Sequence, residues 1–398
     1  MKKILLMVII IFMVASGLVF AEESKEVIGK ADQLIKDKQY NSAFKLLGDA
    51  DPKEENPEIV LKQVEIALNY FGVSTMHQMF GFRDLGPGEI IEDIRGKEGV
   101  YSYYRLEINK VLEPLIAKYP KNWKLYKALG DFYYEVYVKY GNRWFVKEDE
   151  LLALVEKNYT LAYQHGEFDG KSVYAMGYCQ LQQKKYDQAI QYILESLKII
   201  PENADANYNL AYAYLQKGDL DNARKYAEVS MKNYQDEVLK ADAARIVAIT
   251  YREQQNDPKA VEYYKISASL DPGSDYTYIG LMELLVKAKD LAAAADYADK
   301  LFALKPTAPR LTDEILRIYF EGGTQEEFLA FFKRMTAKYQ KEDEILGNLN
   351  FYKAVYYREE ENKKEEKRAL LEANKYFRKC FKPDHYVFKI IDKRLKEL

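Results

Sequence analysis

The chain has 398 residues, of which 48% are hydrophobic, 14% aromatic and 30% charged. This apolar content excludes a disordered chain, and 20 glycines, 11 prolines and two cysteines exclude a collagen-like or disulfide-stapled one. Lys and Arg total 59 against 62 Asp and Glu, which gives a net charge of -3. Because a polyanion binder shows a clear basic excess, nucleic acid is not expected as a partner.

The first 21 residues have the pattern of a signal peptide. Two lysines at 2–3 precede an unbroken apolar run over 4–14, and Val-Phe-Ala at 19–21 suits a cleavage site. We therefore expect export to a periplasm of the Gram-negative type or secretion, with Glu22 as the mature N-terminus. The alternative is an uncleaved anchor, because the apolar stretch reaches about the shortest spanning length. Membrane contact is then expected only through that anchor or through a partner.

Residues 72–100 interrupt the helical patterns on either side of them. Six of the 20 glycines fall in these 29 positions, and a turn signal at 85–88 precedes a short predicted helix over 89–94. A solvated loop rarely keeps as many apolar side chains as this segment does. We therefore favour a packed or binding insertion over a passive loop, with Met79, Phe80 and Phe82 as candidate contact residues.

A shorter insertion is predicted near 141–147, where the helical pattern gains about a dozen residues. Trp144 and Phe145 follow Arg143 there. Local packing of a long turn is favoured over a binding anchor for these aromatic side chains.

The next segment repeats itself. Pro272 and Pro306 are 34 residues apart, and aligning on them matches Ala260 with Ala294. Each unit is predicted to be two amphipathic helices with a small residue at their crossing and a proline after the second helix. Since one such pair cannot bury its apolar face alone, neighbouring pairs must stack. Further residues at the same phase are Gly177, Tyr186, Ala189, Pro201, Leu210, Ala211, Tyr214, Gly218, Ala223, Tyr251 and Leu285.

These residues resemble the tetratricopeptide repeat, whose pattern is a large apolar residue, Leu-Gly, Tyr, Ala, an aromatic residue, Ala and Pro. Four units fit over 170–308, beginning near 170, 204, 241 and 275. Residues 22–71, 101–169 and 309–383 fit as degenerate units, and 384–398 is expected to be a capping helix. The resemblance implies an exported bacterial protein with an all-α fold, a right-handed α-solenoid superhelix of about eight or nine helix pairs.

No catalytic constellation is visible in the sequence. The three histidines share no metal-ligand spacing with the two cysteines, and the phosphate-loop, nucleophile-elbow and H-E-x-x-H motifs are missing. We therefore expect no enzyme, no metal and no other cofactor. Cys179 and Cys380 fall in helical patterns and are expected to be buried, while their pairing as a disulfide is left open.

The resemblance also implies which side chains line a concave groove on the first helices. They form an aromatic stretch beside a basic one, which suits an extended and acidic peptide or protein segment. The alternative is a passive surface on which the arginines pair with Asp242 or Glu253. The inward residues are Tyr174, Tyr178, Leu181, Tyr208, Tyr212, Leu215, Arg245, Ile249, Arg252, Arg310 and Arg317.

The favoured function is a non-catalytic protein-interaction scaffold in the cell envelope, which binds its partner in this groove. One alternative is an accessory protein that docks a periplasmic solute-binding partner of a transport system together with its ligand. The other is an envelope enzyme with a site under residues 72–100. The sequence specifies neither the partner nor the oligomeric state.

Overall fold

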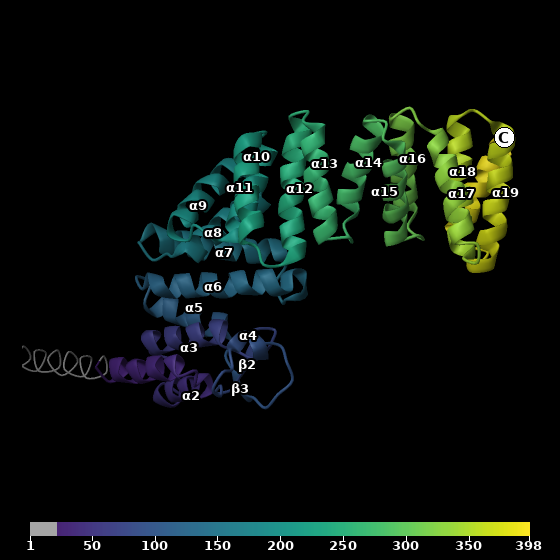
Figure 1. Ribbon diagram of the computed structural model, residues 1–398. Helices are drawn as coiled ribbons and strands as arrows, with labels where there is room; N and C mark the ends of the chain where they lie inside the picture. Colours follow the sequence, from purple (N-terminus) through teal and green to yellow (C-terminus); the bar gives the residue numbers. More distant parts are fainter. Residues whose placement is uncertain (1–21) are drawn as a thin grey trace, which may run out of the picture. The chain divides into compact units, whose positions relative to one another are not determined.

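The computed structural model describes residues 22–398, and the chain divides into two compact units that meet at Pro201 and Glu202 (Figure 1). Each unit is described by itself. The signal peptide expected over 1–21 lies outside the described residues.

The first unit consists of helix pairs and one small sheet. Residues 22–36 are helical, and α6 and α7, like α8 and α9, pack as consecutive pairs. The elements are α2 (Tyr40–Ala50), α3 (Pro57–Asn69), β1 (Val73–Thr75), β2 (Met79–Phe82), α4 (Ile91–Ile94), β3 (Ser102–Arg105), α5 (Ile108–Lys118), α6 (Trp123–Tyr140), the 3-10 helix η1 (Gly141–Arg143), α7 (Glu148–Gln164), α8 (Gly170–Gln182) and α9 (Tyr186–Ile199).

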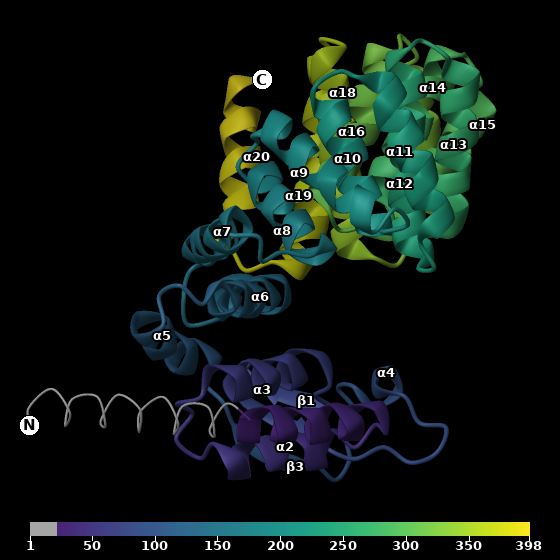
Figure 2. The same ribbon diagram turned by 90° about the vertical axis from the view of Figure 1, so that its left-hand side faces the viewer.

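In its described residues the second unit is helical throughout. Consecutive helices stand side by side from α12 to α19 in Figure 1, and Figure 2 shows α10 to α15 from the side. The helices are α10 (Ala204–Gln216), α11 (Leu220–Asn233), α12 (Glu237–Glu253), α13 (Asp257–Leu270), α14 (Asp275–Lys287), α15 (Leu291–Leu304), α16 (Pro309–Glu321), α17 (Glu326–Lys338), α18 (Asp343–Glu359), α19 (Lys363–Cys380) and α20 (Tyr386–Glu397).

The start of α12 differs from the repeat phase. A unit was expected to begin near 241, but α12 begins at Glu237. The Asp236 side chain caps the helix by accepting a hydrogen bond from the Leu239 backbone N–H at 3.0 Å. A cap four residues earlier therefore lengthens this first helix.

Small residues lie where the two helices of a pair cross. Ala189, Ala223, Ala260 and Ala294 are fully buried. A Cβ added at Gly177 would come within 2.6 Å of Ile193 Cγ1, so only glycine permits that approach. Because the interior is close-packed, an added methylene at such a crossing costs roughly 1–3 kcal/mol.

Between the two helices of a pair, one residue takes a left-handed backbone conformation. Glycine supplies it at Gly218 (φ 76°) and Gly323 (φ 63°), where the missing Cβ makes it unstrained. The equivalent turns use Lys184 (φ 59°), Gln255 (φ 60°) and Lys289 (φ 61°). For such residues the conformation costs roughly 1 kcal/mol.

The insertion at 72–100 contributes to a three-stranded antiparallel sheet in the order β1-β2-β3, which was not predicted. Phe80 pairs with Ser74 on β1 and with Tyr104 on β3, and Gly81 with Val73 and Tyr103. The short helix expected over 89–94 is α4, which begins at Ile91.

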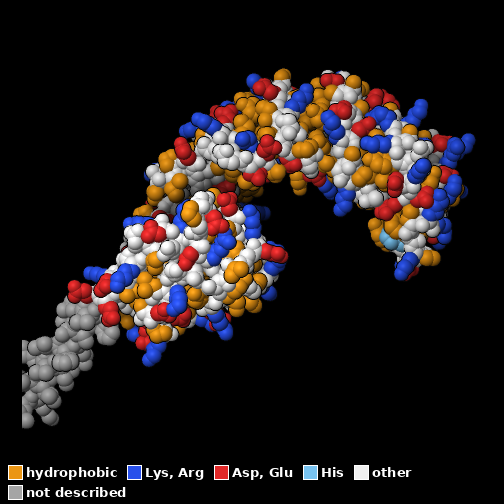
Figure 3. All heavy atoms as spheres, turned by 60° about the horizontal axis from the view of Figure 1, so that its bottom comes forward, with side chains coloured by type: hydrophobic (Ala, Val, Ile, Leu, Met, Phe, Trp, Pro, Cys, Tyr) orange, Lys and Arg blue, Asp and Glu red, His pale blue; other side chains and the backbone are white. Residues whose placement is uncertain are grey.

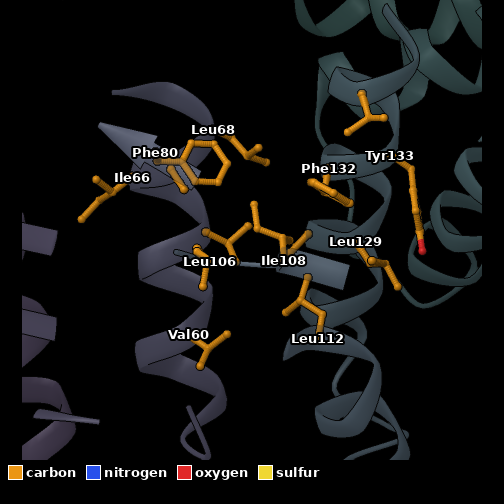
Figure 4. Packing of buried hydrophobic residues seen from close by; sticks show 14 of the residues in the cluster. Val60, Ile66, Leu68, Phe80, Leu106, Ile108, Leu112, Leu129, Phe132 and Tyr133 are labelled. Atoms are coloured by element: carbon orange, nitrogen blue, oxygen red, sulfur yellow. The ribbon is translucent and has the colours of Figure 1, made fainter. Parts of the chain in front are cut away.

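Two of the three candidate contact residues of this insertion were assigned wrongly. Phe80 and Phe82 are fully buried, and Figure 4 shows Phe80 beside Ile66 and Leu68 of α3. These two side chains therefore form core and present no surface to a partner. Met79, whose side chain lies on the other face of β2, is 42% exposed.

Trp144 attaches the second insertion to the first. It is buried, and its Nε1–H donates a hydrogen bond to the Met76 carbonyl oxygen at 2.8 Å. Phe145 is exposed. The two insertions therefore pack together within the first unit.

Both cysteines are free thiols. Cys179 is buried, and burial raises its pKa to about 12. Cys380 is exposed at the end of α19, so the expectation that it is buried was wrong. None of the described helices is both long and apolar enough to cross a membrane.

Candidate functional site

In the first unit, α8 begins with a capping box that fixes its N-terminus. The Asp169 carboxylate accepts from the Ser172 N–H at 2.8 Å, and the Ser172 hydroxyl oxygen accepts from the Asp169 N–H at 2.9 Å. Tyr174 and Tyr178 follow at helical spacing, so they share one face of the helix.

Tyr178 is the centre of a group of four tyrosines that we call the tyrosine cluster. Its ring centroid lies 6.3 Å from that of Tyr134, 6.1 Å from that of Tyr137 and 6.3 Å from that of Tyr174. Tyr137 is buried and the other three are half-buried. Burial, followed by the neighbouring Tyr178, raises the pKa of Tyr137, so this phenol is neutral at physiological pH.

Leu181, the third inward residue expected on α8, is 5% exposed. It is buried and therefore offers no contact surface. On α8 the predicted tyrosines Tyr174 and Tyr178 therefore lie at a surface, whereas the predicted Leu181 does not.

In the second unit, the inward residues of α10 are also tyrosines. Tyr208 is half-buried with its ring 6.4 Å from Tyr234, and Tyr212 is 38% exposed. Leu215 is half-buried against the small core that includes Ala211, and Ile249 of α12 packs against the adjoining core. The two tyrosines therefore provide the reachable surface of α10.

The arginines of α12 are already paired with carboxylates. Arg245 Nη2 lies 2.7 Å from Asp242 Oδ1, and Arg252 lies 3.4 Å from both Glu253 Oε1 and Glu283 Oε2. Although burial opposes it, the Asp242 hydrogen bond raises the pKa of Arg245. The sequence left two alternatives open for these arginines, a basic groove or pairing with Asp242 or Glu253. The contacts found are those of the second alternative.

The arginines of α16 are paired in the same way. Arg310 forms an ion pair with Asp275, and Arg317 Nη2 lies 3.0 Å from Glu283 Oε1 and 2.8 Å from Glu314 Oε2. Burial lowers the pKa of Arg317, but its carboxylate neighbours outweigh that effect and raise it. We call the resulting network the charge ladder: Arg245, Arg252, Arg310 and Arg317 with Asp242, Glu253, Asp275, Glu283 and Glu314.

The charge ladder corrects the prediction of a basic stretch. Each of its arginines has a carboxylate of the same chain beside it, so an acidic partner competes with that carboxylate for the positive charge. Partly exposed pairs of this kind contribute about 0–1 kcal/mol each to stability. On the face drawn in Figure 3, basic and acidic side chains are likewise interspersed in both units.

Two inward residues of α14 were missed. Tyr276 is 66% exposed, with the Arg245 guanidinium 5.6 Å from its ring centroid, and Glu283 joins Arg252 to Arg317. Tyr276 and Glu283 stand one repeat length of 34 residues before Arg310 and Arg317. The repeat phase would therefore have found both of them.

Within residues 22–398, no group of three or more His, Cys, Asp or Glu side chains is placed to hold a metal ion. His165 stacks on Trp123 with ring centroids 3.5 Å apart, and His385 stacks on Phe381 at 4.1 Å. The candidate contact surfaces among the described residues are thus the aromatic and the charged faces of the first helices.

Residues 180–246 match the family described as tetratricopeptide repeat. No curated protein sequence matches the chain significantly.

Several solved structures are similar at low identity. A tetratricopeptide repeat protein from Parabacteroides merdae is 15% identical, with a TM-score of 0.42, over 68% of this chain and 97% of that one. PilF from Pseudomonas aeruginosa is 12% identical, with a TM-score of 0.42, over 55% and 96%. MamA from Desulfovibrio magneticus RS-1 is 19% identical, with a TM-score of 0.39, over 46% and 96%.

All three TM-scores are below 0.5, so the assignment rests on the matched repeats and on the helix pairs themselves. Small residues occupy the helix crossings, and a proline follows each of α9, α13 and α15, as the repeat pattern requires. Residues 180–246 therefore carry tetratricopeptide repeats (TPRs), and the described chain has an all-α, TPR-like fold of tandem helix pairs.

Proposed function

We propose that this protein is a non-catalytic scaffold that binds a protein partner on the inward faces of its first helices. The observation that carries the proposal is the recurrence of reachable tyrosines at that phase in both units: Tyr174, Tyr178, Tyr208, Tyr212 and Tyr276. Tyrosine offers a large contact area and a hydroxyl tip at a low cost in conformational entropy, which suits protein recognition.

The partner is an extended peptide or a protein segment. On the second unit its contacts are aromatic and of mixed charge, because Tyr212 and Tyr276 accompany a charge ladder whose four arginines are each paired within the chain. A strongly acidic partner gains no support there.

We further propose that the scaffold works in the cell envelope after export. The support is the basic, apolar and small-residue pattern of residues 1–21. Cell fractionation followed by N-terminal sequencing tests it, with Glu22 expected as the first residue of protein from the envelope. Full-length protein found in the cytoplasm would contradict it.

Site-specific photo-crosslinking in cells tests the scaffold itself. A photoreactive amino acid at Tyr212 or Tyr276 should give a discrete adduct with a protein partner, because both side chains are exposed on first helices. The matched control is Lys265, which is exposed on the second helix α13. Equal adducts at all three positions, or none at the tyrosines, would refute the proposed face.

A further inference from the structure

Two cations share one aromatic ring in the first unit. Phe71, which follows α3, is buried, and the Arg95 guanidinium carbon lies 4.7 Å from its ring centroid. Lys139 Nζ, from the last turn of α6, lies 4.5 Å from the same centroid. The ring attracts each cation, and this attraction opposes the repulsion between the two positive charges.

Neither cation forms an ion pair with any carboxylate in the part of the chain that the structure describes. Arg95 Nη2 donates to the Asn69 carbonyl oxygen at 2.5 Å, and Lys139 Nζ donates to Ser74 Oγ at 3.5 Å. Both are neutral acceptors. This differs from the charge ladder, in which each arginine has a carboxylate partner.

Glu135 lies one turn before Lys139 on α6, and its charge acts on both cations, but it forms an ion pair with neither. Burial raises the pKa of Glu135, and partial burial together with the charge of Arg95 lowers the pKa of Lys139. Among the described residues, the two cations therefore have no carboxylate within ion-pair distance.

The floor beneath the cations is neutral and polar. His77 is fully buried, and its Nδ1 lies 3.1 Å from Ser74 Oγ and 3.0 Å from the Tyr140 hydroxyl. Its buried Nε2 has no hydrogen-bond partner. Ser74 and Tyr140 each bring a hydroxyl group that is able to donate a hydrogen bond.

We propose that Arg95 and Lys139 form a binding site for a carboxylate side chain of the protein partner. This inference rests on the proposed function only in taking the partner to be a protein. Both cations are exposed to solvent, so an incoming group reaches them. The planar fork of arginine holds a carboxylate in two-pronged fashion, and the lysine adds a point charge.

The site lies on a different side of α6 from the tyrosine cluster. Lys139 comes two residues after Tyr137 and five after Tyr134 on this helix. At about 100° per residue, its direction is about 160° around the helix from that of Tyr137 and about 140° from that of Tyr134. A partner contact at the two cations is therefore separate from a contact at the tyrosines.

Purified protein and three hexapeptides with an uncharged fluorescent dye test the site by fluorescence anisotropy. Hexaglutamate amide carries side-chain carboxylates only, hexaglutamine acid carries a terminal carboxylate only, and hexaglutamine amide carries neither. Hexaglutamate amide should bind at least tenfold more tightly than either glutamine peptide, and added salt should weaken it. Equal binding of hexaglutamine acid would overturn the assignment to a side chain, and no preference would overturn the site.

The variant that removes the site is Arg95→Ala with Lys139→Ala, which should lose at least tenfold in affinity for hexaglutamate amide. The matched control is Lys97→Ala with Lys147→Ala, since both lysines are exposed and the same charge is removed. A Lys139→Arg variant keeps the charge and should retain binding within about threefold. Equal losses in the two double variants would overturn the proposal.

The Trp144 indole N–H resonance reports whether the Met76 turn stays intact in each variant. These measurements use no native partner and no residue of the second unit. The carboxylate site and the crosslinking face can therefore fail independently.

Discussion

Two sites, one in each unit, differ in how their positive charges are paired. In the second unit each arginine of the charge ladder has a carboxylate beside it, and the pairs between helices join residues 31 to 35 positions apart. In the first unit Arg95 and Lys139 lie over Phe71 without one. Regular repeats place each helix beside an equivalent neighbour, so charges of opposite sign meet at one repeat length. Arg95, in the first insertion, has no such equivalent neighbour and no ion pair among the described residues, whereas Arg83 of the same insertion pairs with Glu89.

The largest expected effect tests whether the first insertion is structural. Phe80→Ala should lower the free energy of unfolding by about 3–5 kcal/mol, because it empties a fully buried site between the sheet and α3. Phe145→Ala, at an exposed position, should change it by less than about 0.5 kcal/mol. Urea unfolding measures both, and similar values would mean that the insertion packs loosely.

The next effect is a pH dependence confined to the first unit. Burial, with smaller contributions from the charges of Lys139 and Arg95, lowers the pKa of His77 to about 3 from its ordinary 6.5. Between these values the unfolded chain binds a proton that the folded chain does not. The free energy of unfolding therefore falls as pH falls through this range, by up to about 1.4 kcal/mol per pH unit.

Replacing His77 by Asn removes this proton and keeps a residue that tolerates the left-handed backbone found there (φ 52°). Urea unfolding between pH 6.5 and pH 4.5 should then show a shallower decline of stability than in the unchanged protein. Parallel declines would show that His77 titrates normally in the folded state.

A smaller effect probes the regular repeats of the second unit. Ala260→Leu should destabilise by roughly 1–3 kcal/mol, since Ala260 is fully buried at a helix crossing. Ala292→Leu adds the same volume at an exposed position of α15 and is the control. The shift in urea midpoint distinguishes them, and an unchanged midpoint for Ala260→Leu would place that residue outside a close crossing.

The smallest effect concerns the charge ladder. Replacing Arg245 and Arg252 by Ala should change the free energy of unfolding by no more than about 1–2 kcal/mol, at about 0–1 kcal/mol for each partly exposed pair. Affinity for hexaglutamate amide should stay within about twofold, because these arginines are already paired. A tenfold loss would show that the ladder opens to acidic ligands and would erase the difference between the two sites.

The helix pairs could be predicted because their signal is periodic. The prolines after the second helices and the buried alanines recur at nearly constant spacing, and each has one physical reason to be there. The early start of α12 could not be predicted in this way, because the Asp236 cap lies outside the repeat phase.

The candidate site was predicted less well, because exposure and pairing depend on neighbours far away in the chain. Phe80 and Phe82 stand in a glycine-rich segment that resembles a loop, and the strands that bury them are three or four residues long. Arg95 comes from the first insertion and Lys139 from the last turn of α6, and they meet over Phe71. No spacing pattern in the sequence predicts that these two side chains lie over the same ring.

The turns with non-glycine residues in the left-handed conformation have a consequence for how this chain evolves. Lys184, Gln255 and Lys289 each occupy a backbone state that glycine supplies at Gly218 and Gly323. Glycine at the three positions would relieve roughly 1 kcal/mol each, less the entropy that glycine loses on folding. Because the turns belong to separate pairs, the gains should nearly add. Glycine at these turns could therefore raise the stability of the chain and offset the cost of substitutions that alter its choice of partner.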